Sequence, residues 1–252
     1  MVKAKKHLGQ HFLADKNIAN KIAVSLINPD KLDILEIGPG TGVLTQFLIE
    51  RPEKITLAEI DDESVEYLNE NFDDVFKLLH TDFLKMNLQD YFDNELCIIG
   101  NFPYNISSQI FFKLLDDREK VPELVGMIQK EVAERLASKH GNKTYGILSV
   151  LLQLFYKIDY LFTVGEQVFI PPPKVKSAVI RLERYRSDIE GVTYKKLKLV
   201  VKTAFNQRRK TMRNSLKSIL PLGYETSHEF FTKRPEQLSP EQFVELTKLI
   251  FK

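Results

Sequence analysis

The residues with the clearest chemical potential lie in the segment Asn101-Phe102-Pro103-Tyr104, at the end of an apolar run. Asn and Pro favour turns, but a turn needs no aromatic residue on each side of the proline. One reaction that such a segment could serve is transfer of a group to the exocyclic amine of adenine. This amine is a poor nucleophile because its lone pair is delocalised into the ring. The side-chain oxygen of Asn101 and the backbone carbonyl of Phe102 or Pro103 could accept its two hydrogens and aim the nitrogen at an electrophile. Tyr104 offers a face on which an extruded base can stack.

A glycine-rich segment, Glu36-Ile37-Gly38-Pro39-Gly40-Thr41-Gly42, lies between a strand-like run and a helix-like one. Glycine lets the backbone turn tightly and approach a ligand closely. The spacing differs from the dinucleotide pattern, in which the third glycine comes three residues after the second, and no phosphate-loop Lys-Ser/Thr pair follows. We therefore expect Gly38 and Gly40 to hold a cofactor that has no phosphate, and S-adenosylmethionine is one.

Two acidic residues stand where the next two predicted strands end. Glu59 could accept hydrogen bonds from both hydroxyls of a ribose, as acidic residues do in dinucleotide-binding folds. Asp82 could accept one from an adenine amine. Together with the segment 101–104, these residues favour S-adenosylmethionine, whose sulfonium methyl is a good electrophile. Positioning and electrostatics would then carry the rate, without a strong general base.

The elements that must position these residues alternate between strand-like and helix-like patterns. Such alternation predicts an α/β fold with a parallel sheet covered on both faces, and with ligands beyond the carboxyl ends of the strands. The predicted strands are 33–37, 54–59, 76–79, 95–99 and 124–128, and the predicted helices are 17–26, 43–50, 63–71, 107–115 and 130–137.

The pattern changes in the last third of the chain. Three prolines, 171–173, lead into an alternating apolar segment that ends at Leu182 and is typical of an antiparallel edge strand. After about Tyr185 the β pattern stops, and residues 194–220 and 240–251 have the spacing of amphipathic helices. We therefore predict a catalytic sheet domain over residues 1–185 and a small all-helical domain over residues 186–252.

Several classes of protein are disfavoured by the composition. The single cysteine, Cys97, cannot form an intramolecular disulfide and is interpreted as a buried apolar residue. The most apolar run, 147–156, is about half as long as a bilayer requires, and no signal-peptide pattern follows the basic N-terminus. His7 and His11 are four residues apart, but no third ligand is evident, so no metal is expected. These features predict a cytoplasmic protein without a membrane or metal partner.

The segment 101–104 resembles the Asn-Leu/Ile/Phe-Pro-Tyr motif of adenine amino-methyltransferases. The rest of the chain resembles the ribosomal small-subunit RNA adenine dimethyltransferase family. The segments that carry this second resemblance occur in order along nearly the whole chain, at residues 8–13, 36–42, 169–179 and 204–214.

The resemblance implies a Rossmann-like class I methyltransferase, dependent on S-adenosylmethionine, with a helical C-terminal domain. Its substrate would be two neighbouring adenosines in a hairpin near the 3′ end of small-subunit rRNA, within the immature 30S subunit, and we expect the enzyme to be a monomer. Phe169 would be a second base-stacking aromatic, opposite Tyr104. The implied cofactor contacts are His11, Leu13, Gly38, Glu59, Asp82 and Asn101. Many family members have Asn at the position of His11, and Leu is usual at Met212.

The second predicted domain is basic, with 14 Lys and Arg against 7 Asp and Glu, whereas the first 185 residues have 22 against 27. On a helical wheel for residues 194–220, cations gather on one side, next to an apolar stripe that would pack on the protein. A solvated helix face is the alternative interpretation, but the charge excess favours the RNA backbone. The cations on this side are Lys198, Lys202, Arg209, Arg213 and Lys217. The residues expected to bind RNA are Lys202, Arg208, Arg209, Lys210 and Arg213.

Two other functions remain open from the sequence. Antibiotic-resistance methyltransferases share the catalytic motif but modify large-subunit rRNA, and the segment 207–210 favours the small-subunit family over them. A non-catalytic RNA-binding assembly factor could keep the same fold. The presence of Asn101, Tyr104 and Phe169 argues that the chemistry is retained.

Overall fold

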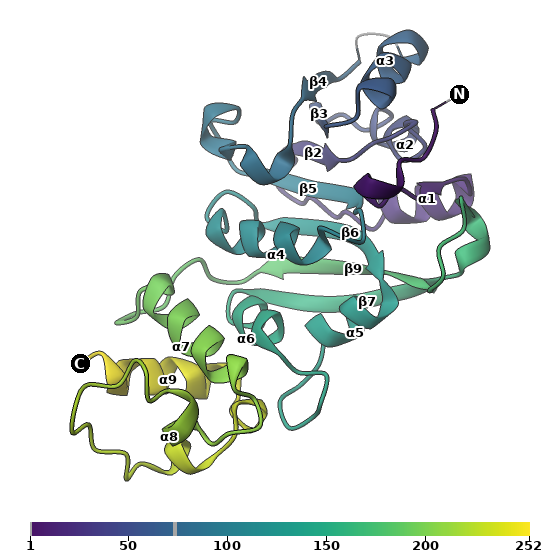
Figure 1. The fold of residues 1–252 in the computed structure, drawn as a ribbon. Helices are drawn as coiled ribbons and strands as arrows, with labels where there is room; N and C mark the ends of the chain where they lie inside the picture. Colours follow the sequence, from purple (N-terminus) through teal and green to yellow (C-terminus); the bar gives the residue numbers. More distant parts are fainter. Residues whose placement is uncertain (1, 73–74) are drawn as a thin grey trace. The chain divides into compact units, whose positions relative to one another are not determined.

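A computed structural model describes residues 2–72 and 75–252 of the chain, and its central feature is a seven-stranded sheet (Figure 1). The strand order is β4-β3-β2-β5-β6-β9-β7, and a separate two-stranded sheet pairs β1 with β8. The strands are β1 (Phe12–Leu13), β2 (Asp33–Ile37), β3 (Ile55–Glu59), β4 (Lys77–His80), β5 (Leu96–Asn101), β6 (Glu123–Gln129), β7 (Tyr156–Val164), β8 (Phe169–Ile170) and β9 (Ser177–Arg184).

Helices connect the strands and form the C-terminal part of the chain. The α-helices are α1 (Lys16–Ala23), α2 (Thr45–Leu48), α3 (Asp62–Asn71), α4 (Ser107–Asp116), α5 (Lys130–Leu136), α6 (Ile147–Gln153), α7 (Tyr194–Asn206), α8 (Met212–Ser215) and α9 (Pro240–Ile250). Short 3-10 helices are η1 (Lys6–Leu8), η2 (Phe83–Lys85), η3 (Leu88–Asp90), η4 (Glu166–Val168), η5 (Glu229–Thr232) and η6 (Pro235–Gln237).

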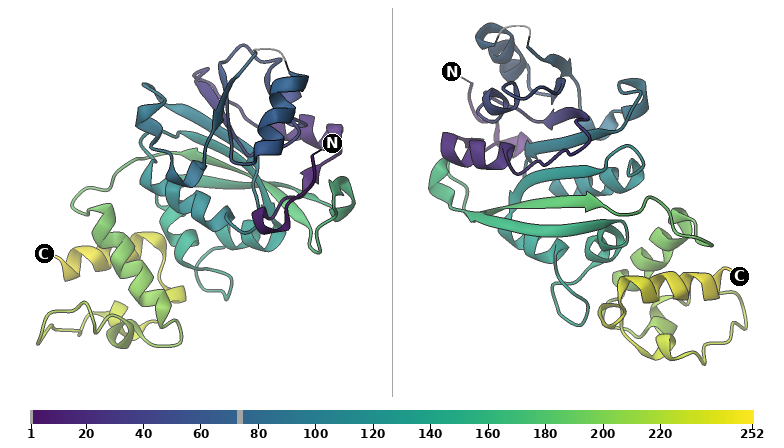
Figure 2. Two further views of the ribbon diagram at one scale, coloured as in Figure 1. Left: turned by 45° about the horizontal axis from the view of Figure 1, so that its top comes forward. Right: turned by 180° about the vertical axis from the view of Figure 1, so that it is seen from behind.

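The parallel part of the sheet confirms the predicted α/β fold. β4, β3, β2, β5 and β6 are mutually parallel. α4 covers one face of this sheet, whereas α1 and α2 lie on the other (Figures 1 and 2). β3 is buried along its whole length, and β2, β5 and β6 are buried except for one terminal residue each. Such continuous burial is expected for strands that are covered on both faces.

The antiparallel edge differs from the prediction. β9 pairs antiparallel with β6, as expected, but it lies inside the sheet, because β7 forms the edge. No strand was predicted over 156–164, where the side chains are mostly half-buried and alternation is weak. The apolar run at 147–156 contributes α6 and only the first residue of β7.

The predicted single helix over residues 194–220 is wrong. α7 ends at Asn206, a turn follows, and α8 is a separate short helix. The segment 207–210 has good intrinsic helix propensity, so local pattern alone suggests continuation. A contact distant in sequence outweighs this propensity: the backbone N–H of Met212 donates to the carbonyl of Lys233 at 2.8 Å, and the Met212 side chain is fully buried.

The break also corrects the helical wheel of cations. Lys198 and Lys202 lie on α7, whereas Arg209 lies in the turn, Arg213 on α8 and Lys217 after it. These five side chains therefore do not share the face of one continuous helix.

The chain divides into two compact units, one of residues up to 133 with 158–184, the other of 134–157 with 185–252. The predicted boundary after residue 185 lies at one junction between them. Residues 134–157 were predicted to belong to the sheet domain, but they group with the C-terminal helices, because α6 packs against α7 and α9. Within the described residues, no helix has the length and apolar character that a bilayer crossing requires.

Candidate active site

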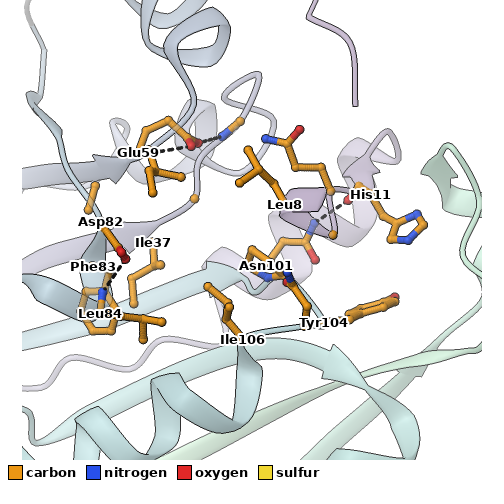
Figure 3. A pocket seen from close by; sticks show the side chains of 18 of the residues that line it. Leu8, His11, Ile37, Glu59, Asp82, Phe83, Leu84, Asn101, Tyr104 and Ile106 are labelled. Atoms are coloured by element: carbon orange, nitrogen blue, oxygen red, sulfur yellow. Dashed lines mark hydrogen bonds between the residues drawn. The ribbon is translucent and has the colours of Figure 1, made fainter. Parts of the chain in front are cut away.

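A pocket opens at the carboxyl ends of the parallel strands, within the first unit (Figure 3). It lies where the strand order reverses, because β2 is flanked by β3 on one side and by β5 on the other. Open α/β sheets bind ligands at such a switch point. Residues that follow β2, β3, β4 and β5 line it together with an N-terminal segment, and among them are Leu8, His11, Gly38, Gly40, Glu59, Asp82, Asn101, Pro103 and Tyr104.

The glycine loop after β2 forms one wall of this pocket. Gly38 and Gly40 have φ values of 65° and 57°, in the left-handed region that favours glycine. A side chain at Gly40 would also collide with the ring of Phe12, since a Cβ there would lie 2.8 Å from it. The loop therefore depends on glycine for its conformation and for its packing against the N-terminal segment.

Glu59 ends β3 with its carboxylate at the pocket and only 4% of its surface exposed. Its Oε1 accepts hydrogen bonds from the backbone N–H groups of Ile60 and Asp61, and its Oε2 accepts one from Gly40 at 3.0 Å. Burial raises the pKa of Glu59, although these three hydrogen bonds act in the opposite direction. Because a carboxylate has about four acceptor positions, about one position, on Oε2, remains for a ligand hydroxyl.

Next to the carboxyl of Asp82, which comes after β4, the pocket is lined by apolar side chains. Asp82 Oδ1 accepts from the backbone N–H of Leu84 at 3.0 Å, which caps η2 and fixes the carboxyl at the pocket. Phe83, Leu84 and Ile106 line the same end of the pocket (Figure 3), and Ile60 contributes a half-exposed aliphatic side chain. An acceptor beside apolar surfaces suits a flat, polar-edged ring such as a purine.

Asn101, the last residue of β5, faces the pocket from the opposite wall (Figure 3). Its side-chain Nδ2 donates to the backbone carbonyl of His11 at 3.0 Å. No hydrogen bond to its Oδ1 is found among residues 2–72 and 75–252. The amide is thus held by its nitrogen, and its oxygen remains available as an acceptor.

The turn after Asn101 is anchored in the core by Phe102, which is 1% exposed. The carbonyl of Pro103 accepts from the N–H of Ile106 at 3.2 Å, which closes the turn. Within the described chain the carbonyl of Phe102 has no such partner. Of the two carbonyls predicted as acceptors, that of Phe102 is therefore the open one.

Tyr104 is held at the rim of the pocket by its hydroxyl, which lies 2.5 Å from Ser177 Oγ. Burial raises the pKa of Tyr104, and this hydrogen bond partly offsets the effect. The imidazole of His11 lies next to the ring, with centroids 5.4 Å apart and planes 32° apart. His11 Nδ1 is itself 2.7 Å from the carbonyl of Pro171.

The N-terminal segment that lines the pocket is tied to the rest of the unit at several places besides the Asn101–His11 bond, and three of them follow. Lys5 forms an ion pair with the buried carboxylate of Asp61. The pKa of Asp61 is lowered, because hydrogen bonds from Lys5 and Ser64 outweigh the opposing effect of burial. Asn105 Nδ2 donates to the carbonyl of His7 at 3.3 Å. The third tie is the pairing of β1 with β8.

Glu36 lies at the base of the glycine loop and does not line the main pocket. It is 1% exposed, and its Oε2 accepts from Thr45 Oγ1 at 2.7 Å. Burial raises the pKa of Glu36 to about 8 against the effect of that hydrogen bond. The side chain is therefore mostly neutral at pH 7.

Two of the predicted site residues lie elsewhere. Phe169 is 2% exposed, belongs to the hydrophobic core and does not line the pocket, so no face of its ring is open to a base in this conformation. Leu13 is also a buried core residue outside the main pocket. Their proposed contacts with substrate and cofactor stay predictions.

The basic residues predicted to bind RNA all belong to the second unit. Lys202, Arg209, Lys210 and Arg213 are exposed. Arg208 is partly buried, since 35% of its side chain is exposed, and its Nη2 donates to the backbone carbonyl of Asn142 at 3.0 Å.

Sequence reasoning missed several residues of the site. Phe83 and Leu84 directly follow Asp82, so their place beside the pocket could have been inferred from that position. The contacts of Ser177 with Tyr104 and of Asn105 with His7 join residues more than 70 positions apart. No local pattern indicates such contacts.

A family model described as ribosomal RNA adenine dimethylase matches residues 1–251 of the chain. The ribosomal RNA small subunit methyltransferase A of Parabacteroides distasonis is 57% identical over 249 residues, covering 98% of this chain and 94% of that protein. The protein of the same name from Porphyromonas gingivalis is 57% identical over 253 residues, covering 99% and 98%.

Solved structures show the same architecture. A dimethyladenosine transferase from Plasmodium falciparum superposes with a TM-score of 0.75 and 26% identity, covering 94% of this chain and 96% of that one. The 23S rRNA methyltransferase ErmE superposes with a TM-score of 0.67 and 24% identity, covering 96% and 100%. The likeness to ErmE bears on the fold alone.

Proposed function

The chain belongs to the ribosomal RNA adenine dimethylase family, and we propose that its pocket transfers methyl groups from S-adenosylmethionine to adenine amines of small-subunit rRNA. One observation carries this proposal. The Asn101 side chain, with its nitrogen bound to His11 and its oxygen open, lies in the same pocket as the glycine loop, Glu59 and Asp82.

The residues of the first unit suit S-adenosylmethionine. Gly38 and Gly40 allow close approach to the backbone, Glu59 has an acceptor position left for a ribose hydroxyl, and Asp82 would accept from the adenine amine. Phe83 and Leu84 would contact the adenine ring. When bound, the cofactor supplies an electrophilic methyl group on a sulfonium.

The remaining residues would hold the target base. Asn101 Oδ1 and the Phe102 carbonyl would accept the two hydrogens of its exocyclic amine and aim the nitrogen lone pair at the methyl group. Tyr104, whose hydroxyl is fixed by Ser177, would stack on the extruded base. After transfer, the nitrogen carries an extra proton that passes to solvent, so the chain needs no strong base.

The substrate can be specified further. We infer that two neighbouring adenosines, in a hairpin near the 3′ end of the rRNA, are each methylated twice on the immature small subunit in the cytoplasm. Family membership and the retained segments 8–13, 101–104 and 169–179 support this. The cations of the second unit would hold the RNA backbone.

Mass spectrometry after incubation with labelled cofactor tests the proposal. Small-subunit rRNA, as naked RNA and as immature subunits from cells that lack the modification, should gain dimethyladenosine at two adjacent positions. Large-subunit rRNA serves as the control and should gain none. Methylation of the large-subunit RNA alone would overturn the choice of substrate, and absence of methyl transfer to either RNA would overturn the enzymatic assignment.

A further inference from the structure

A short polar loop between α5 and α6, residues 139–144, projects from the second unit (Figure 1). All six of its residues are exposed, and three of them are Lys139, His140 and Lys143. Asn142 fixes the shape of the loop. Its Oδ1 accepts from Ser138 Oγ at 2.8 Å and from the N–H of Thr144 at 2.9 Å, and its Nδ2 donates to the carbonyl of Lys139 at 2.8 Å.

This loop is bound to the turn that follows α7, although the two segments are 66 residues apart. Arg208 Nη2 donates to the Asn142 carbonyl at 3.0 Å, and Arg208 Nε lies 3.8 Å from Glu236 Oε2. The backbone N–H of Gly141 donates to the carbonyl of Glu236 at 2.6 Å. Arg208 thus contacts the loop through one hydrogen bond and Glu236 through an ion pair, and it joins the loop to the turn.

Four cations flank the Arg208–Asn142 contact: Lys139 and Lys143 on the loop, and Arg209 and Lys210 on the turn. All four are exposed. In the described part of the chain none of the four has an ion-pair partner, and Glu236 is already engaged by Arg208. Positive charge that is concentrated without acidic partners attracts a polyanion.

We propose that Lys139, Lys143, Arg209 and Lys210 form one composite binding surface for the RNA phosphate backbone, held together by Arg208 as a positioning residue. This inference rests on the proposed function, which supplies RNA as the polyanion. The chemistry of the loop agrees with a phosphate backbone: residues 138–144 include no large apolar side chain that could enter a bilayer or an apolar protein groove. Arg208 stays predicted from sequence as a phosphate contact, and in this proposal it also holds the surface together.

Salt-dependent binding tests the surface. Affinity of the full-length protein for small-subunit rRNA is measured between about 50 and 200 mM salt, a range over which phosphate contacts change affinity strongly. Each phosphate contact contributes roughly 0.7 to 0.9 to the slope of log affinity against log salt. The double variant Lys139→Gln/Lys143→Gln should lower that slope by about 1.4 to 1.8. Its KM for RNA should rise, while kcat at saturating RNA and the Kd for cofactor stay at wild-type values.

The matched control is Lys54→Gln/Lys77→Gln, which neutralises two exposed lysines at the amino ends of β3 and β4. This control should keep the wild-type slope. If the loop variant also keeps the wild-type slope while the wild-type protein methylates the RNA, the composite surface is refuted and the proposed function stands. If the wild-type protein methylates no small-subunit rRNA, the proposed function itself fails, whatever the slopes.

A second pair of variants tests the role of Arg208. Arg208→Gln should increase backbone amide hydrogen exchange in the loop 139–144, because it removes the bond to the Asn142 carbonyl, and should lower the salt slope. Arg209→Gln should lower the slope by one contact and leave loop exchange unchanged. Equal exchange in the two variants would contradict the positioning role.

Discussion

The side-chain nitrogen of Asn101 donates a hydrogen bond to the backbone carbonyl of His11, 90 residues earlier in the chain. This bond decides which way the amide points, since a donor must face the carbonyl. The oxygen of Asn101 therefore faces the pocket, where the proposed reaction needs an acceptor. The N-terminal segment therefore both lines the pocket and orients the Asn101 side chain in its wall.

Substitution of Asn101 should test whether its oriented side chain is needed for methyl transfer. In Asn101→Asp the carboxylate would face the His11 carbonyl without a proton to share, so the side chain should turn away from its position. We expect kcat to fall by about 10²- to 10³-fold, the loss seen when one oriented transition-state group is removed. Asn101→Ala should fall at least as far. Calorimetry should show cofactor binding largely intact in both, and full activity in either variant would refute the assigned role.

Gly9 makes the N-terminal segment sensitive to a single methyl group. Its φ of 67° is left-handed, and a Cβ there would lie 2.6 Å from Asn105 Oδ1. Gly9→Ala should therefore weaken the contact between Asn105 and the segment, and the cofactor Kd should rise roughly tenfold, which corresponds to about 1.4 kcal/mol.

Gly223→Ala is the matched control for this change. Gly223 has a φ of 75° but nothing lies within 4 Å of its Cβ position, so the variant carries the backbone strain without the collision. Its cofactor affinity should match that of the wild type. An equal loss in both variants would show that strain alone, and not the contact with Asn105, is responsible.

Glu36 should make stability fall as pH rises. The pKa of its carboxyl is raised from 4.5 to about 8 in the folded chain. Between these values the folded state binds a proton that the unfolded state has lost, so each pH unit should lower the free energy of unfolding by up to about 1.4 kcal/mol. The contribution is complete below about pH 4.5 and is lost as pH rises toward 8. Glu36→Gln should flatten this dependence.

Denaturant unfolding of the wild type and Glu36→Gln at several pH values between 5 and 8 measures the effect. The two curves of stability against pH should converge at the acidic end and separate as pH rises, with the variant the more stable at pH 8. Parallel curves would mean that another group controls the pH dependence.

How much of this site could be predicted depends on how local its signals are. Four features of the site each stand at or just after the end of a predicted strand: the glycine loop, Glu59, Asp82 and Asn101. The alternation of strands and helices predicts a parallel sheet, so these features are expected at one edge of it. The end of α7 and the burial of Phe169 depend on partners distant in sequence, Lys233 for the first and β1 for the second. Helix propensity alone therefore predicts too long a helix after residue 194. The position of Phe169 in its motif does not indicate whether its ring is buried.

The last prediction concerns Phe102, which fixes the turn that carries the proposed catalytic groups. Its ring fills the space above two glycines: a Cβ at Gly126 would lie 2.4 Å from the ring, and one at Gly100 would lie 2.8 Å from it. Gly126→Ala should therefore overpack the core, at a cost of about 1–3 kcal/mol, and lower Tm by roughly 2–4 °C per kcal/mol. Because Phe102 adjoins Asn101, kcat should fall as well.

Gly146→Ala is the control for this change, since the nearest atom to its Cβ position, the Thr144 carbonyl oxygen, is 3.9 Å away. A second substitution tests the cause directly. In Gly126→Ala/Phe102→Leu the smaller side chain makes room for the added methyl group, so the double variant should recover part of the lost Tm and kcat. If the double variant is less stable than Gly126→Ala alone, contact with the Phe102 ring is not the source of the defect, and the turn is positioned by other contacts.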